Sequence, residues 1–359
     1  MTKASSHNGY LDFLKFVFAL GVMGVHTELA GFGFTMLRGG YLGVDFFFLV
    51  SGYFTTRLAL EMRRRKDVDH QDAIVRYFIK QIKRLYPFYF VSCLYGFLVR
   101  SVINSLAATP IEDLSMSFGW AIFDLIPVQI QGICGFNPTQ VQWYVGAFFV
   151  VSPLLFALVL RYGESFSLTF APIISTFLIG LLQMKCGGIR SNGVFVDGIV
   201  FDGVLRAVGD MFLASTLYSI SARFSCTQLK KAGTVVVRLV MLGLGMGMIW
   251  MCFVPSSAGY SDAIFIPVIF LYLLLLFSWR KYSAIFDTAL VQELQKISVV
   301  LFMIHIKTGQ CINAFWYEGP LPMKLFLYYA CSILIAWGLY YLTSFATVQL
   351  RKGMQLLVK

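Results

Sequence analysis

The stretch 11-LDFLKFVFALGVMGVHTELA-30 decides the fold class of this chain. About 20 mostly apolar residues form a helix long enough to cross a bilayer core of about 30 Å. Lys15 and His26 lie inside this stretch, and because an ionisable group in a membrane costs about 2.5 kcal/mol or more, each is a functional candidate. Their spacing of 11 residues corresponds to about 20° beyond three helical turns, which predicts one shared face and an axial separation of about 16 Å.

The composition of the whole chain is that of a membrane protein. Hydrophobic residues make up 58% and charged residues 13% of the sequence, whereas soluble domains have about 45–50% and about 25%. We therefore expect an all-α polytopic membrane helix bundle, with residues 1–359 forming one single membrane-embedded domain. The first apolar run contains Lys15 and lacks a small-residue cleavage site, so it is not interpreted as a signal peptide.

The net charge of +11 is better explained by cytoplasmic loops than by nucleic-acid binding, because basic residues mark the cytoplasmic side of membrane proteins. The seven cysteines are scattered and contain no C-x-x-C pair. They are interpreted as small buried hydrophobic residues, and neither a disulfide framework nor a metal site is expected.

About ten transmembrane helices are predicted from the apolar runs. The segment 117–136 contains Asp124, Pro127 and Gly132 and is interpreted as re-entrant or interfacial. The predicted spans are 11–30, 40–60, 86–106, 141–160, 166–185, 199–220, 236–254, 263–279, 297–315 and 324–346.

The basic loops predict the orientation of the spans. The connection after the second span, 57–84, is strongly basic, and counting alternately from it puts the basic connections 223–231 and 280–296 on the same side. Because basic loops stay cytoplasmic, we expect both the N-terminus and the C-terminus to be cytoplasmic, in a multi-pass protein of the cell (inner or plasma) membrane. The sequence contains no repeat of the kind that relates the two halves of many transporters.

The second span contains the run 43-GVDFFFLVSG-52, with two polar side chains in an aromatic segment. Gly43 and Gly52 permit close helix approach, and Ser51 can hydrogen-bond across a helix interface. Because no base is visible beside Ser51, a structural role is favoured over that of a nucleophile. Asp45 is expected either to orient a histidine or to pair with a cation across the bundle.

The segment 76-RYFIKQIKRLYP-87 precedes the third span and presents Arg76, Lys80, Lys83 and Arg84 at helical spacing. The ordinary positive-inside signal and anionic lipid binding both explain such a face. The functional alternative is a docking surface for a phosphorylated cytoplasmic ligand, because phosphates bind convergent arginine and lysine side chains.

Further candidates lie in the later spans. His305 lies near the middle of the ninth span; a lone histidine there is more often structural, but it is the second intramembrane histidine. Trp143 and Tyr144 open the fourth span at its outer end, where an aromatic belt is the simple interpretation. The absence of P-loop, Rossmann, zinc and G-x-S-x-G motifs gives little support to NTP hydrolysis or cofactor redox chemistry.

Taken in order, these motifs resemble the acyltransferase-3 family of integral membrane acyltransferases, of the O-acetyltransferase type. LDFLKFVFALGVMGVH is similar to its opening L-D-x-L-R pattern with a histidine eleven residues after the arginine, and GVDFFFLVSGYF to its G-V-D-x-F-F-x-x-S-G-[FY] signature. KRLYPFY, QWYVGAFF and ISVVLFMIH resemble three further motifs, so the matches run from about residue 10 to 310. Lys15 replaces the arginine of the first motif, and the usual R-x-x-R pair falls on Gln81 and Arg84. Val299 and Phe302 replace the tyrosines of the last motif.

The resemblance implies a ten-span enzyme that moves an acyl group, usually acetyl, onto a hydroxyl of a cell-envelope carbohydrate or glycolipid. Acetyl-CoA is then the donor substrate, with no permanently bound cofactor. Because some members carry an extracytoplasmic hydrolase-like domain and this chain ends at Lys359, we expect direct transfer or a hand-off to a separate extracytoplasmic acyl-accepting protein.

In this interpretation the phosphates of CoA dock on Lys80, Lys83 and Arg84, with Lys15 at the mouth of a tunnel, while the pantetheine arm threads toward His26. His26 acts as general base or acyl carrier, Asp45 orients it and His305 lines the opposite wall. Ser51, Trp143 and Tyr144 complete the expected substrate-binding set. Two alternatives stay open: a transporter or flippase for an envelope glycolipid that uses the same buried charges, and a degenerate membrane scaffold.

Overall fold

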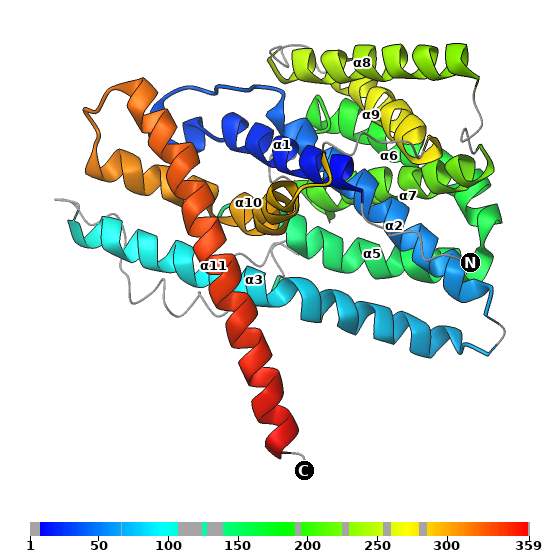
Figure 1. Cartoon of the computed structure of the whole chain (residues 1–359), viewed down its shortest axis with the longest axis horizontal. Coiled ribbons are helices and arrows are strands. Elements are labelled where there is room, and N and C mark those ends of the chain that lie inside the picture. Colours follow the sequence, from blue (N-terminus) through cyan, green and yellow to red (C-terminus); the bar gives the residue numbers. More distant parts are fainter. Residues whose placement is uncertain are drawn as a thin grey trace.

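The computed structural model describes residues 8–65, 67–106, 124–127, 139–190, 195–224, 230–253, 260–279 and 286–357. This part of the chain is almost entirely helical (Figure 1). Its α-helices are α1 (Gly9–Val25), α2 (Gly43–Arg63), α3 (His70–Leu106), α5 (Trp143–Tyr162), α6 (Ala171–Cys186), α7 (Asp202–Arg223), α8 (Lys231–Phe253), α9 (Tyr260–Ser278), α10 (Ala289–Phe315) and α11 (Leu321–Leu357). Short elements connect them: η1 (Glu28–Phe32), η2 (Gly40–Leu42), η4 (Phe166–Phe170) and the antiparallel pair β1 (Phe195–Val196) and β2 (Val200–Phe201).

Each predicted span falls on one of these helices, which confirms the all-α bundle. Within the described residues, six helices are long and apolar enough to cross a membrane: His70–Leu106, Trp143–Tyr162, Phe166–Cys186, Lys231–Phe253, Ala289–Phe315 and Leu321–Gly353. The number of ten spans and the cytoplasmic termini stay predictions. The segment 117–136 lies outside the described residues except for 124–127.

The first predicted span, 11–30, is shorter as a helix than the sequence predicts. Helix α1 ends at Val25, and a π-helical turn follows at Glu28–Phe32. The hydroxyl of Thr27 donates to the carbonyls of Gly24 and Phe34 and accepts from the backbone N–H of Met36. These bonds replace the helical ladder where α1 stops, so His26 lies at a helix end and not within a helix.

Helices α2 and α7 pack closely against each other. A side chain at Gly52 is sterically excluded, because its Cβ would lie 2.6 Å from the carbonyl oxygen of Met211. This observation confirms the prediction that the glycine of the second span permits close helix approach.

The outer surfaces of several helices are apolar and uncovered. Helix α8 lies at one edge of the bundle (Figure 1), and only 6% of its apolar window is buried within the protein. Helix α11 crosses α10 and extends beyond the other helices, and its side chains Leu334, Trp337 and Phe345 are exposed. Such surfaces require an apolar solvent, and the lipid bilayer supplies one.

Candidate active site

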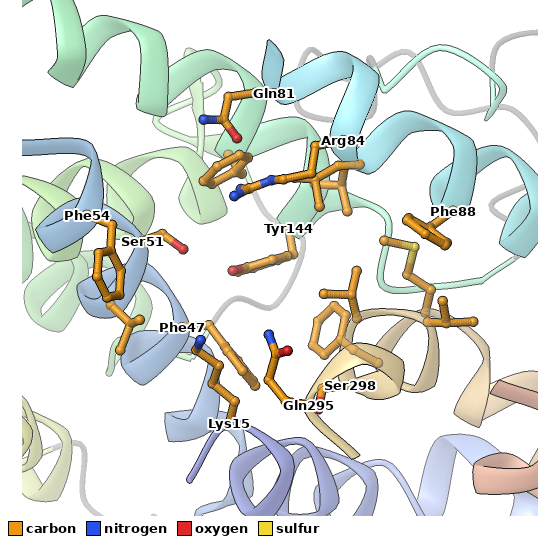
Figure 2. Close-up of a pocket in the computed structure, with 18 of the residues that line it drawn as sticks. Lys15, Phe47, Ser51, Phe54, Gln81, Arg84, Phe88, Tyr144, Gln295 and Ser298 are labelled. Atoms are coloured by element: carbon orange, nitrogen blue, oxygen red, sulfur yellow. The ribbon is translucent and has the colours of Figure 1, made fainter. Parts of the chain in front are cut away.

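A cavity of about 510 Å³ lies between α2, α3, α5 and α10, with further lining from α1 and α11. Its wall is largely aromatic and aliphatic, with Phe47, Phe54, Phe88, Phe148 and Phe302 among its members. Figure 2 shows Lys15 and Arg84 reaching into this space from different sides, with Tyr144 between them.

The charges that line the cavity are all positive. Lys15, Lys80, Arg84 and Lys296 contribute to its wall, and no aspartate or glutamate does so among the described residues. Two of these lysines have local ion-pair partners: the Nζ of Lys15 lies 3.0 Å from Asp12, and that of Lys296 lies 2.6 Å from Glu293. A cavity with this charge favours a polyanionic ligand whose remaining parts are apolar.

The basic stretch before the third predicted span contributes unequally to this cavity. Lys80 and Arg84 line it, whereas Lys83, which is exposed like them, is not part of its wall. Gln81, which stands where the family pattern has its first arginine, is buried at 7% exposure and also lines the cavity. Lys296 was counted from the sequence only as a loop charge, and its position at the start of the ninth predicted span was the available signal.

The two aromatic residues at the start of α5, Trp143 and Tyr144, point in different directions. Tyr144 lines the cavity and packs against Phe48, with the ring centroids 4.6 Å apart and the rings tilted by 34°. Trp143 is not part of the cavity wall and packs against Gly203 and the ring of Phe201. Ser51 also lines the cavity.

The two intramembrane histidines are brought together. Nδ1 of His26 lies 2.9 Å from Nε2 of His305, although the residues are 279 positions apart. The His305 ring is fully buried, and its Nδ1 lies 3.2 Å from the carbonyl oxygen of Leu301. The pair occupies the end of α1 and the middle of α10, two helices that pack against each other.

The histidine pair lies directly behind one wall of the cavity. Phe302 lines the cavity, and its ring centroid is 6.2 Å from that of His305. Helices α1 and α10 each carry a cavity lysine before their histidine, with 11 residues from Lys15 to His26 and 9 from Lys296 to His305. These spacings correspond to about 16 Å and about 14 Å of helix. A ligand anchored on the lysines can therefore extend toward both imidazoles.

Asp45 does not approach the histidines, so the expectation that it orients His26 is not supported by the geometry. Its carboxylate accepts from Nε and Nη2 of Arg206 at 2.8 and 2.7 Å, and Asp210 interacts electrostatically with both side chains. The alternative expectation, a cation partner across the bundle, is the observed one. Arg206 and Asp210 lie four residues apart in the apolar span 199–220, and that spacing of charges was the signal the sequence analysis missed.

Within the described part of the chain, no three histidine, cysteine, aspartate or glutamate side chains come together as a metal site would require. The site therefore consists of a cation-lined apolar cavity and, behind Phe302, a pair of hydrogen-bonded imidazoles.

Comparison with known families agrees with this arrangement. A family model described as an acyltransferase domain, Acyl_transf_3, matches residues 8–341. Among curated proteins and among solved structures, no chain matches this one.

Proposed function

The chain belongs to the acyltransferase-3 family, and from that premise we propose that it transfers an acyl group from cytoplasmic acyl-CoA to a hydroxyl of a cell-envelope carbohydrate or glycolipid. The acyl group proposed is acetyl. Membrane acyl transfer follows from the family. The CoA donor, the acetyl group and the envelope acceptor are what we propose in addition.

The observation that carries the proposal is the cation-lined cavity that ends beside two imidazoles. CoA has a phosphorylated nucleotide at one end and a thioester at the other, joined by a long, largely uncharged arm. Lys80, Arg84 and Lys296 supply donors for the phosphates, because charge-assisted hydrogen bonds to phosphate are the strong ones. The apolar wall toward Phe302 suits the pantetheine arm and the acyl group.

Lys15 and Arg84 are expected to contact the donor in different ways. Lysine is a compact charge without the fork of arginine, so Lys15, in place of the family's arginine, contacts one phosphate or carbonyl oxygen. Arg84 retains the planar fork and is the position at which a bidentate phosphate contact is expected. Lys83, which is not part of the cavity wall, is left out of the donor site.

The chemical step uses His26 as general base. An imidazole has an ordinary pKa of about 6.5, which suits proton transfer near neutral pH. The Nε2 of His26 takes the proton of the acceptor hydroxyl while that oxygen attacks the thioester carbonyl. The C–O bond forms, the C–S bond breaks, and the departing thiolate receives the proton from His26. Atoms and charge then balance, with free CoA and the acylated acceptor as products.

The acceptor is proposed to arrive from the side opposite the cavity mouth, where α1 ends at His26. That end of α1 is followed by the partly exposed turn Glu28–Phe32. A separate extracytoplasmic protein that receives the acyl group is the second form of the same proposal, and it changes the acceptor but not the role of His26.

The test is thiol release from acetyl-CoA by purified protein in proteoliposomes, with candidate sugars on the outside. The wild type is compared with His26→Ala and with His70→Gln, a control substitution of an exposed histidine on α3. Release that requires His26 and survives His70→Gln supports the proposal. Acceptor movement without release of free CoA would favour the transporter alternative, and release that persists in His26→Ala would overturn the assignment of the base.

A further inference from the structure

We infer that His305 is a positioning residue that holds His26 in the tautomer with the hydrogen on Nδ1 and the lone pair on Nε2. The inference rests on the proposed function, because it concerns the base of that reaction, and it assigns the second imidazole a task that differs from lining a wall.

The hydrogen positions follow from a chain of contacts. The Leu301 carbonyl can only accept, so the Nδ1 of His305, 3.2 Å away, carries the hydrogen of that ring. A neutral imidazole has one N–H and one acceptor nitrogen. The Nε2 of His305 is therefore the acceptor, and the Nδ1 of His26, at 2.9 Å, must donate to it.

The consequence for His26 is a defined base. With its hydrogen on Nδ1, the neutral ring presents the Nε2 lone pair away from His305. In this tautomer the His26 ring is a donor toward His305 and an acceptor at its other nitrogen.

The packing of α10 holds His305 in place. Its ring is 0% exposed, and one turn later Gly309 allows α10 to approach the segment after His26, because a Cβ there would lie 2.4 Å from the Cβ of Ala30. At the same junction, the ring of Tyr328 lies against Gly309, and its hydroxyl donates to the Met23 carbonyl of α1 at 3.0 Å. The two imidazoles therefore meet between well-packed backbones, as a preorganised hydrogen bond requires.

The arrangement also matters when His26 becomes charged. After Nε2 of His26 takes the acceptor's proton, the imidazolium keeps its Nδ1–H bonded to the neutral His305, which is polarised by the Leu301 carbonyl. A buried carboxylate in that place would have to be desolvated as a charge. The neutral imidazole stabilises the cation without that cost, and the proton then leaves from Nε2 to the thiolate.

The test compares His305→Gln, whose amide oxygen can replace Nε2 as the acceptor, with His305→Leu, which has no acceptor. We expect His305→Leu to lower kcat by about 100-fold with the KM for acetyl-CoA unchanged, because loss of a correctly protonated base removes general-base catalysis. His305→Gln should recover a substantial part of kcat. Equal losses in the two variants, or a loss that appears in KM, would overturn the inference.

A second measurement reads the tautomer without activity. The chain has four histidines, so ¹⁵N-histidine NMR of the reconstituted protein, with His26→Ala for assignment, resolves the two ring nitrogens of His26. The expected wild-type signature is a protonated Nδ1 and an unprotonated Nε2, and the preference should be lost in His305→Leu. The opposite tautomer in the wild type would overturn the inference.

The two proposals fail in different ways. If His26→Ala keeps full activity, the proposed base is wrong, whatever the tautomer. If His26→Ala is inactive but His305→Leu keeps the wild-type kcat, the proposed function stands and only the positioning role falls.

Discussion

Arg206 on α7 donates two hydrogen bonds to the carboxylate of Asp45 on α2, and the exposed fractions of the two side chains are 2% and 0%. Its second nitrogen, Nη2, also donates to the Tyr41 carbonyl at 2.8 Å. The pair therefore ties the start of α2 and the turn before it to α7. Asp45 belongs to the most specific motif of the sequence. Because its carboxylate is bound to Arg206 of another helix, it stabilises the packing of α2 on α7.

The first prediction concerns the stability of this pair. Arg206→Met leaves Asp45 and the neighbouring Asp210 without their cation, and breaking a buried pair costs about 3–5 kcal/mol. Asp45→Asn should cost less, because the carboxyl of Asp210, one turn along α7, interacts electrostatically with Arg206 and leaves the cation with a counter-charge. Denaturant unfolding in detergent micelles measures both differences.

The matched control for this prediction is Glu61→Gln, which breaks the exposed pair of Arg57 and Glu61 on the same helix α2, where the side chains are 44% and 46% exposed. That change should cost about 0.3–0.5 kcal/mol. A larger effect of Asp45→Asn than of Arg206→Met would contradict the role of Asp210 as a counter-charge.

The second prediction separates the two basic neighbours on α3. Arg84→Ala should raise the KM for acetyl-CoA by about tenfold or more with little change in kcat, because a hydrogen bond to a charged group contributes about 1.5–3 kcal/mol. Lys83→Ala removes a charge one residue away that is not part of the cavity wall and should leave KM nearly unchanged. Initial rates over a range of donor concentrations measure both, and equal effects would move the donor site out of the cavity.

The third prediction concerns the length of the acyl group. The rings of Phe47 and Phe302, with centroids 6.4 Å apart, both line the cavity, and the ring of Phe302 also lies beside His305. Phe302→Ala removes a phenyl ring from the place where we expect the acyl group, so the variant should accept butyryl-CoA better relative to acetyl-CoA. The ratio of kcat/KM for the two donors measures this preference. An unchanged ratio would indicate that the acyl group does not reach Phe302.

The sequence predicted the helices because they depend on local patterns, and of the expected basic face Lys80 and Arg84 line the cavity whereas Arg76 and Lys83 do not. Apolar runs of about 20 residues fall on the observed helices, and the three- and four-residue spacing of Lys80 and Arg84 puts both on one side of α3, where both line the cavity. The end of α1 was predicted less well, because hydropathy continues past Val25 while the hydrogen bonds of Thr27 end the helix.

The partners of the buried polar groups could not be predicted, since they depend on which helices become neighbours. His26 and His305 were each recognised as unusual, but their contact spans 279 residues and nothing local indicates it. Asp45 had two possible partners in the sequence analysis, and only the packing of α2 on α7 selects Arg206. Similarly, the register of α5 turns Tyr144 into the cavity and Trp143 away from it.

The last prediction tests whether the histidine contact depends on the packing of α10. Gly309→Ala adds a methyl group 2.4 Å from the Cβ of Ala30, and because neither backbone can move without a neighbour moving, the overpacking should cost about 1–3 kcal/mol. Helix α10 then shifts away from the turn after His26, and kcat should fall while the KM for acetyl-CoA stays constant. Gly338→Ala on α11 is the control, because a Cβ there meets no atom within 4 Å, and alanine in an exposed helix stabilises it by about 1 kcal/mol relative to glycine. Wild-type kcat in Gly309→Ala would mean that the imidazole pair tolerates the displacement of α10, and the close approach at Gly309 would then serve stability alone.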